Sequence, residues 1–118
     1  MPAKTNTGYG LIRIDDNVIA TLAGISAMES YGIVGMASKN ATDGLFELLR
    51  GDHLSRGIKV YSKDDTLTID LHVILEYGVR ISVVAENIIE RVKFNVENLT
   101  GMKVDKINVH VEGIRVEK

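Results

Sequence analysis

The chain has 118 residues, of which 45% are hydrophobic and 25% charged, and its formal net charge is −2. This length suits one domain with a real core. The near-neutral charge argues against a mainly electrostatic grip on nucleic acid, which needs clustered Lys and Arg. The absence of cysteine excludes disulfides, thiol catalysis and thiolate metal sites.

The sequence offers neither a signal peptide nor an apolar run near the roughly 18 residues that a membrane span requires. Residues 1–8 are polar, and we expect them to form a flexible N-terminus ahead of a single domain over 9–118. If the protein meets a membrane, we expect the contact to be made by a partner or by a surface patch.

The first third of the chain predicts a strand, a helix and a second strand. Residues 9–14 alternate like a strand, and Asp15 and Asp16 then suit the start of a helix. The spacing of apolar residues predicts this helix over 17–30. Its predicted packed face consists of Val18, Leu22, Ile25 and the neighbouring Ile19, Ala23 and Ser26. Residues 33–37 follow as a short, buried strand.

A short helix is predicted over 41–50, and it is rich in large apolar residues. Leu45, Phe46, Leu48 and Leu49 cannot all lie on one narrow stripe of a helix. Leu45, Phe46 and Leu49 are therefore candidate partner contacts, as is Phe94, which falls off the apolar stripe of a later helix. The alternative is that the short helix caps the core or the edge of the sheet.

The second half of the chain alternates more sharply. Strands are predicted at 58–61, 67–75 and 107–111, with an amphipathic helix over 81–99 before the last strand. The predicted order is β-α-β-α-β-β-α-β. One-faced strands with amphipathic helices indicate a two-layer α+β domain, in which the helices pack on one face of a largely antiparallel sheet.

The other face of that sheet is predicted to be polar, and it holds two of the three histidines. Asp70, His72 and His110 all fall on this face, so it is a candidate ligand site or interface. Two histidines and a carboxylate can bind a metal, but no short ligand spacing supports such a site here. Whether His72 and His110 meet depends on whether their strands pair.

Other chemical motifs are weak. The segment from Gly32 to Lys39 lacks the spacing of a phosphate-binding loop. Its Gly-Ile-Val-Gly start matches the loop of KH-type RNA modules, but its apolar middle is typical of a strand. The sequence also lacks a Gly-X-Ser-X-Gly nucleophile motif. We therefore predict no catalytic residues, no cofactor and no resident metal.

Ordered segments along nearly the whole chain resemble one known family. They include Tyr9-Gly-Leu-Ile-Arg-Ile, Tyr31-Gly-Ile-Val-Gly-Met-Ala, Ile69-Asp-Leu-His-Val-Ile-Leu-Glu-Tyr-Gly and Val109-His-Val-Glu-Gly-Ile. This set resembles the alkaline shock protein family of Gram-positive bacteria, and within it the small YloU-like branch. The resemblance implies a cytoplasmic α+β protein tied to stress and cell-envelope homeostasis, with no established enzymatic activity.

The resemblance also implies partners, because some family members self-assemble and are held at the membrane by an anchor protein. Genes of this branch often neighbour one for a fatty-acid kinase component. The leading expectation is a non-catalytic scaffold or adaptor that forms homo-oligomers through the sheet face, an edge strand or the 45–49 segment. A helper of a lipid pathway that uses an apolar cavity, and a KH-like RNA module, are the alternatives.

Overall fold

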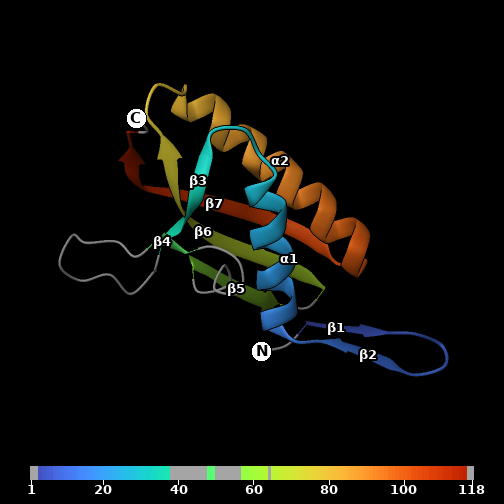
Figure 1. Ribbon diagram of the computed structural model, residues 1–118. Coiled ribbons are helices and arrows are strands. Elements are labelled where there is room, and N and C mark those ends of the chain that lie inside the picture. The colour runs from blue at the N-terminus through green and yellow to red at the C-terminus, as the bar shows by residue number, and fades with distance from the viewer. Residues whose placement is uncertain (1–2, 38–47, 50–56, 64, 117–118) are drawn as a thin grey trace.

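The computed structural model describes residues 3–37, 48–49, 57–63 and 65–116. The elements in chain order are β1 (Ala3–Asn6), β2 (Leu11–Ile14), α1 (Asp16–Met28), β3 (Ile33–Ala37), β4 (Leu48–Leu49), β5 (Ile58–Lys63), β6 (Thr66–Glu76), α2 (Ile81–Thr100) and β7 (Lys103–Arg115). Both helices cover one face of the main sheet (Figure 1). The predicted α+β class, with a mostly antiparallel sheet, is confirmed.

Strand β6 is the centre of the main sheet. It pairs antiparallel with β5 along its first half and with β3 along its second half. On its other side it pairs with β7, in parallel and along its whole length. Because a parallel pair needs a long crossover, α2 runs back across the sheet between β6 and β7 and contacts β7.

Side chains alternate along β6, and those on one side form the buried, apolar face of the sheet, which we call the dry face. The β6 side chains on the dry face are Leu67, Ile69, Leu71, Val73 and Leu75. The stripe of α2 that packs against this core is Val84, Ile88, Val92 and Val96, at the helical spacing that the sequence predicts. Gly101 ends α2 in the left-handed conformation, with φ of 74°, as a helix-terminating glycine commonly does.

Helix α1 packs through its small residues. Ala20, Ala23, Gly24 and Ala27 are buried, whereas Val18 and Ile25 are each 49% exposed. The predicted packed face is therefore wrong for Val18 and Ile25 and right for the buried Ala23. Ile19 is fully buried as well, and the small residues on the same side let the helix backbone approach its neighbours closely, which leaves Val18 and Ile25 on the outer side.

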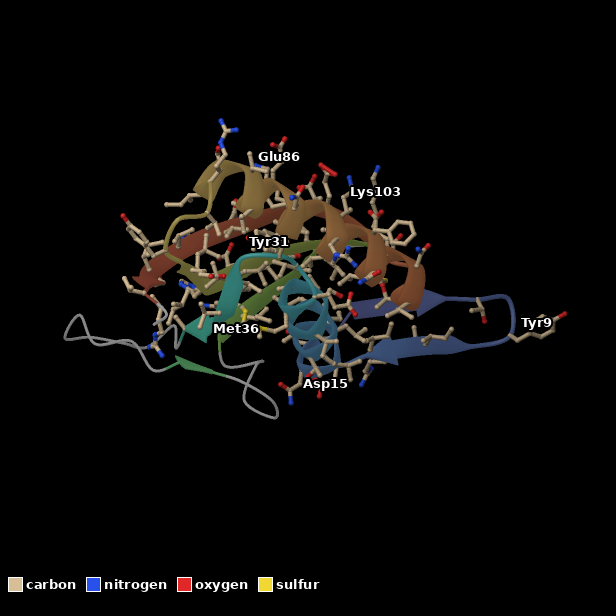
Figure 2. The ribbon with its side chains drawn as sticks, turned by 45° about the horizontal axis from the view of Figure 1, so that its top comes forward. Tyr9, Asp15, Tyr31, Met36, Glu86 and Lys103 are labelled. Atoms are coloured by element: carbon tan, nitrogen blue, oxygen red, sulfur yellow. The ribbon has the colours of Figure 1, made fainter. Side chains whose placement is uncertain are left out.

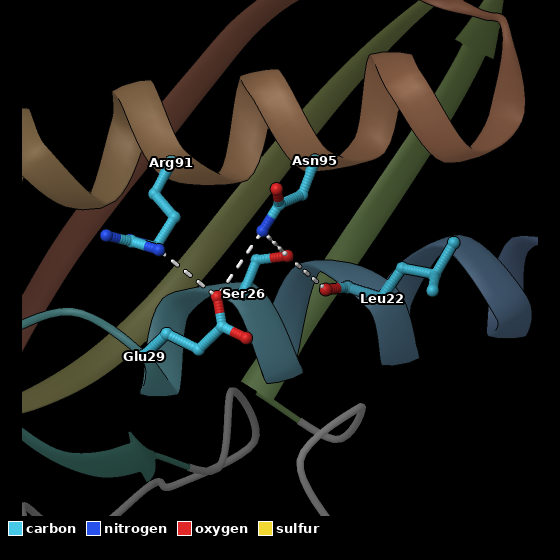
Figure 3. Close-up of polar contacts among 5 residues, drawn as sticks. All are labelled: Leu22, Ser26, Glu29, Arg91 and Asn95. Atoms are coloured by element: carbon cyan, nitrogen blue, oxygen red, sulfur yellow. Dashed lines mark hydrogen bonds and ion pairs between the residues drawn. The ribbon is translucent and has the colours of Figure 1, made fainter.

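A polar contact joins the two helices (Figure 3). Ser26 is buried, donates a hydrogen bond to the carbonyl of Leu22 at 2.8 Å, and accepts one from Asn95 Nδ2 at 3.0 Å. Nearby, Arg91 Nη1 lies 3.3 Å from Glu29 Oε1 at the surface. The Ser26–Asn95 bond satisfies a buried hydroxyl and sets the position of α1 along α2.

The segment between β3 and β5 differs from its prediction. Leu48 and Leu49 form strand β4, paired antiparallel with Ala37 and Met36, so these two residues are not helical. Local apolar content favoured a helix, but pairing with a buried strand overrides that preference. The rest of the predicted helix over 41–50 lies outside the described residues.

The N-terminal strands form a separate two-stranded sheet. β1 pairs antiparallel with β2, and the hairpin projects from the body with Tyr9 at its tip (Figure 2). Strand β2 is shorter than the strand predicted over 9–14, since Tyr9 lies in the turn. Residues 3–6, expected within a flexible N-terminus, form β1 because pairing with β2 overrides their polar composition. Leu11 and Ile12 on this hairpin are both about half exposed.

We predict that Gly57→Ala destabilises the fold by about 1–3 kcal/mol. A Cβ at Gly57 would lie 2.6 Å from the carbonyl oxygen of Ala37 and 3.0 Å from Met36 Cβ, so the backbone of β3 would have to move. Gly113→Ala is the matched control, because its nearest neighbour would be Ile74 Cγ1 at an ordinary 3.9 Å. Urea denaturation of both variants measures the difference, and equal unfolding free energies would contradict the prediction.

Candidate functional site: the polar sheet face and an aromatic groove

The polar face of the sheet is organised by the pairing of β6 with β7. In this register Asp70 lies opposite Asn108, and His72 lies opposite His110. Asn108 Nδ2 donates a 2.8 Å hydrogen bond to Asp70 Oδ1. The structure therefore brings the polar-face residues Asp70, His72 and His110 together across one strand pair.

The two histidines are in contact. Their rings stack with centroids 4.7 Å apart and an interplanar angle of 14°. His72 Nδ1 also lies 2.6 Å from Glu112 Oε2, close enough for the ring N–H to donate to the carboxylate. The side chains of His72 and Glu112 are only 19% and 27% exposed. His110 lies on the outer side of this group, where it is exposed to solvent.

A bulge in β7 marks the position of Glu112. The register steps from Val73 opposite Val111 to Ile74 opposite Gly113, which leaves Glu112 as the extra residue. Bulges of this kind re-aim side chains and occur often near functional sites. Sequence alternation could place Glu112 on the polar face, but it could not reveal the contact with His72.

The contacts of this cluster are hydrogen bonds and ring stacking between β6 and β7. Within the described residues, no group of three or more His, Asp or Glu side chains has an arrangement that could hold a metal ion. The stacked histidines and the Asp70–Asn108 bond instead tie the two strands together. The hydrogen-bonding side chains of this cluster that stay exposed to solvent are Asn108 and His110 on the outer strand β7.

A groove lies elsewhere, along the outer side of α2. Two open hollows of about 550 and 400 Å³ share Tyr31 and Asn87 in their walls, so they lie side by side. Phe94 lines the first hollow, and Tyr77 and Val83 line the second. The three aromatic rings are strongly exposed, at 80% for Tyr31, 70% for Tyr77 and 67% for Phe94.

The first hollow also contains a buried polar group. Ser30 is 8% exposed and lines the hollow, and its hydroxyl has no hydrogen-bond partner among the described residues. Most buried hydroxyls in proteins are hydrogen-bonded, so an unpaired one in the wall of a groove is consistent with an external partner. We call these two adjacent hollows the aromatic groove.

The predicted contact residues have different outcomes. Phe94 is exposed and lies in the aromatic groove. Leu49 belongs to strand β4, and Leu45 and Phe46 lie outside the described residues. Sequence reasoning missed the groove as a unit. The sequence pattern that could have indicated the groove is weak, because Tyr31 and Tyr77 each precede a turn glycine but lie far apart in the sequence.

A model of the alkaline shock protein 23 family, described as having a cell envelope-related function, matches residues 4–116. The chain belongs to this alkaline shock protein family. The predicted resemblance is thereby confirmed, and the match covers the hairpin, both helices and the whole polar face. None of the described helices of this family member has the length and apolarity of a membrane span.

Relatives within the family match over almost their full length. The chain is 45% identical to the uncharacterized protein YloU of Bacillus subtilis, covering 98% of each chain. It is 47% identical to the uncharacterized protein Spy1614 of Streptococcus pyogenes, covering 98% of this chain and 97% of that one. Among solved structures, a nickel form of the MamM CTD aligns over 86% of this chain and 98% of its own, with a TM-score of 0.48 and 10% identity.

We predict that the two histidines of this alkaline shock family protein contribute unequally to stability. His72→Ala removes the partner of the part-buried Glu112 carboxylate, and we expect a loss of about 1 kcal/mol. His110→Ala removes an exposed ring, and we expect its unfolding free energy to fall by only a few tenths of a kcal/mol. Urea denaturation of the two variants at one pH provides the measurement. A larger loss for His110→Ala would show that the stacking, and not the Glu112 contact, stabilises the cluster.

Proposed function

We propose that this chain is a non-catalytic cell-envelope protein that works as a scaffold or adaptor, through self-association and contacts with other proteins. The observation that carries the proposal is the aromatic groove. Tyr31, Tyr77 and Phe94 are exposed together around two adjacent hollows. Aromatic residues are enriched at protein interfaces, and grouped exposure of this kind marks interaction sites.

The chemistry of the groove favours a protein partner. Its walls combine exposed aromatic rings with polar side chains, among them Arg80, Asn87 and Asn95, so hydrogen-bond donors lie beside the rings. An extended segment of another protein offers both apolar side chains and backbone carbonyls to such a surface. A membrane-anchor protein and a fatty-acid kinase component are the partners that the family resemblance suggests.

The alternatives receive less support. A lipid-binding helper would need an apolar cavity between helices and sheet, but both hollows open on the surface beside α2. A KH-like RNA module would need its Gly-X-X-Gly loop between two helices. Here Gly32 lies in a turn after α1, and Gly35 lies inside strand β3. The basic residues that such a module would use are Lys39, Arg50, Arg56 and Lys59, and of these only Lys59 lies within the described residues.

Phe94→Ser tests the groove. We expect about a tenfold loss of partner recovery, typical for truncating an aromatic anchor, when the tagged protein is isolated from membrane and soluble fractions of its own cells. Stability should change little, because Phe94 is mostly exposed. Leu99→Ser is the matched control, since Leu99 is 66% exposed on the same helix but does not line the groove. Equal recovery with both variants would exclude the groove as the contact.

Self-association is tested separately by light scattering on the purified protein over a range of concentrations. The proposal predicts a mass above the 13.0 kDa of one chain that rises with concentration. A constant monomer mass up to high micromolar protein would remove self-association from the proposed function. That outcome would not change the conclusion drawn about the groove from Phe94→Ser.

A further inference from the structure

We infer that the outer edge of β7 is a homodimer interface, where two copies pair antiparallel about a twofold axis at Val109 and join their sheets. This deepens the self-association part of the proposed function and rests on it. Strand β7 has 13 residues and, among the described residues, pairs with β6 alone. Half of its backbone N–H and C=O groups therefore point away from the sheet, and such an edge is a template for another strand.

The dry face of the sheet is also left open along this edge. Val109 and Val111 pack against the main core, as does Ile89 on α2, yet all three are only half-buried. Figure 1 shows α2 lying along β7 above this side of the sheet. A second copy set against β7 would continue the apolar layer and cover these side chains.

The sequence of β7 selects the register. Pairing must keep Ile107, Val109 and Val111 on the dry side, because a shift by one residue would turn every side chain over. With the axis at Val109, Ile107 of each copy faces Val111 of the other. On the polar side Lys106 and Glu112 lie at equal distances from the axis, so each lysine faces a glutamate. Cross-strand pairs of opposite charge are favourable.

The neighbouring registers lose this complementarity. With Asn108 on the axis, Lys106 would face His110. With His110 on the axis, two histidines would face each other, and Glu112 would face Asn108. The Val109 axis places Lys106 opposite Glu112, whereas the His110 axis brings opposite charges together only at Asp105 and Arg115, which both lie outside the regularly paired stretch of β7. Between the register irregularities at the two ends of β7, regular pairing covers residues 106–111, and Val109 lies within that stretch. Glu112 is the bulge residue that directly follows it, so the contact with Lys106 of the second copy is made by a side chain at the end of the regular stretch.

The other outer strand is a poorer candidate. Strand β5 has six residues, and its charged side chains are Lys59 and Lys63, with no acid to match them. The Glu112 carboxylate, by contrast, keeps partial exposure although its Oε2 contacts His72. It therefore lies on the polar face within reach of a lysine from a second copy. The symmetric use of one strand by both copies gives a closed dimer.

Single-cysteine cross-linking tests the axis directly, because the native chain has no cysteine. Directly opposed residues of antiparallel strands have Cα atoms at a separation that a disulfide can bridge. We expect Val109→Cys to form a covalent dimer on mild oxidation. Val60→Cys is the matched control, since Val60 is a half-buried dry-face valine on the outer strand β5. It should stay monomeric on a denaturing gel.

Charge reversal provides the second readout, with variants that keep the fold. Lys106 is exposed, and Lys106→Glu should raise the dimer dissociation constant roughly tenfold by opposing two glutamates at each end of the pair. Lys63→Glu, the same charge change on β5, should leave the dimer dissociation constant unchanged. Lys106→Glu combined with Glu112→Lys should recover most of the loss.

The outcomes separate the two proposals. A dimer that persists while Val109→Cys fails to cross-link and Lys106→Glu has no effect would overturn the β7 interface and leave self-association standing. Cross-linking of Val60→Cys instead would move the interface to β5. A protein that is monomeric at all concentrations would overturn both the interface and self-association.

Discussion

The parallel pairing of β7 with β6 is the constraint on which the rest of the structure depends. It requires a crossover, and α2 supplies it with an apolar stripe that covers the dry face of the sheet. The same register places His72 beside His110 and Asp70 beside Asn108 on the opposite face. Pairing with β6 on one side also leaves β7 as an outer strand. The core, the polar cluster and the available edge are therefore three consequences of one strand pair.

The two faces of this sheet have different roles in stability. The dry face buries the alternating side chains of β6 against α1 and α2, and hydrophobic burial supplies most of the stabilisation. The polar face contributes little by comparison, because partly exposed ion pairs and hydrogen bonds yield about 1 kcal/mol or less each. We therefore expect single substitutions on this face to leave the fold intact, whereas substitutions in the core would not.

Much of this arrangement can be predicted from the sequence, and the failures have physical causes. Period-two alternation in 67–75 and 107–111 indicates which side chains share a face, and this is enough to group Asp70 with the two histidines. Contact between the histidines depends on register, which alternation does not encode. Leu48 and Leu49 favour a helix locally, but they pair with β3 as strand. On α1, a hydrophobicity pattern ranks Val18 above Ala23, whereas close packing favours the smaller side chain.

The groove and the β7 edge suggest a division of labour within one small domain. The groove is built from α2 and from the turns that follow α1 and β6, and its rings are exposed beside Arg80 and Arg91. The β7 edge runs along the sheet and carries the polar cluster. Pairing of two copies through β7 would use backbone hydrogen bonds and would leave each Phe94 exposed for a separate partner. A dimer with two free grooves binds a repeated or clustered partner more tightly than either groove alone, because the second contact is intramolecular. An adaptor of the cell envelope gains most from that arrangement where its partner is concentrated, as an anchor protein is when confined to a membrane surface.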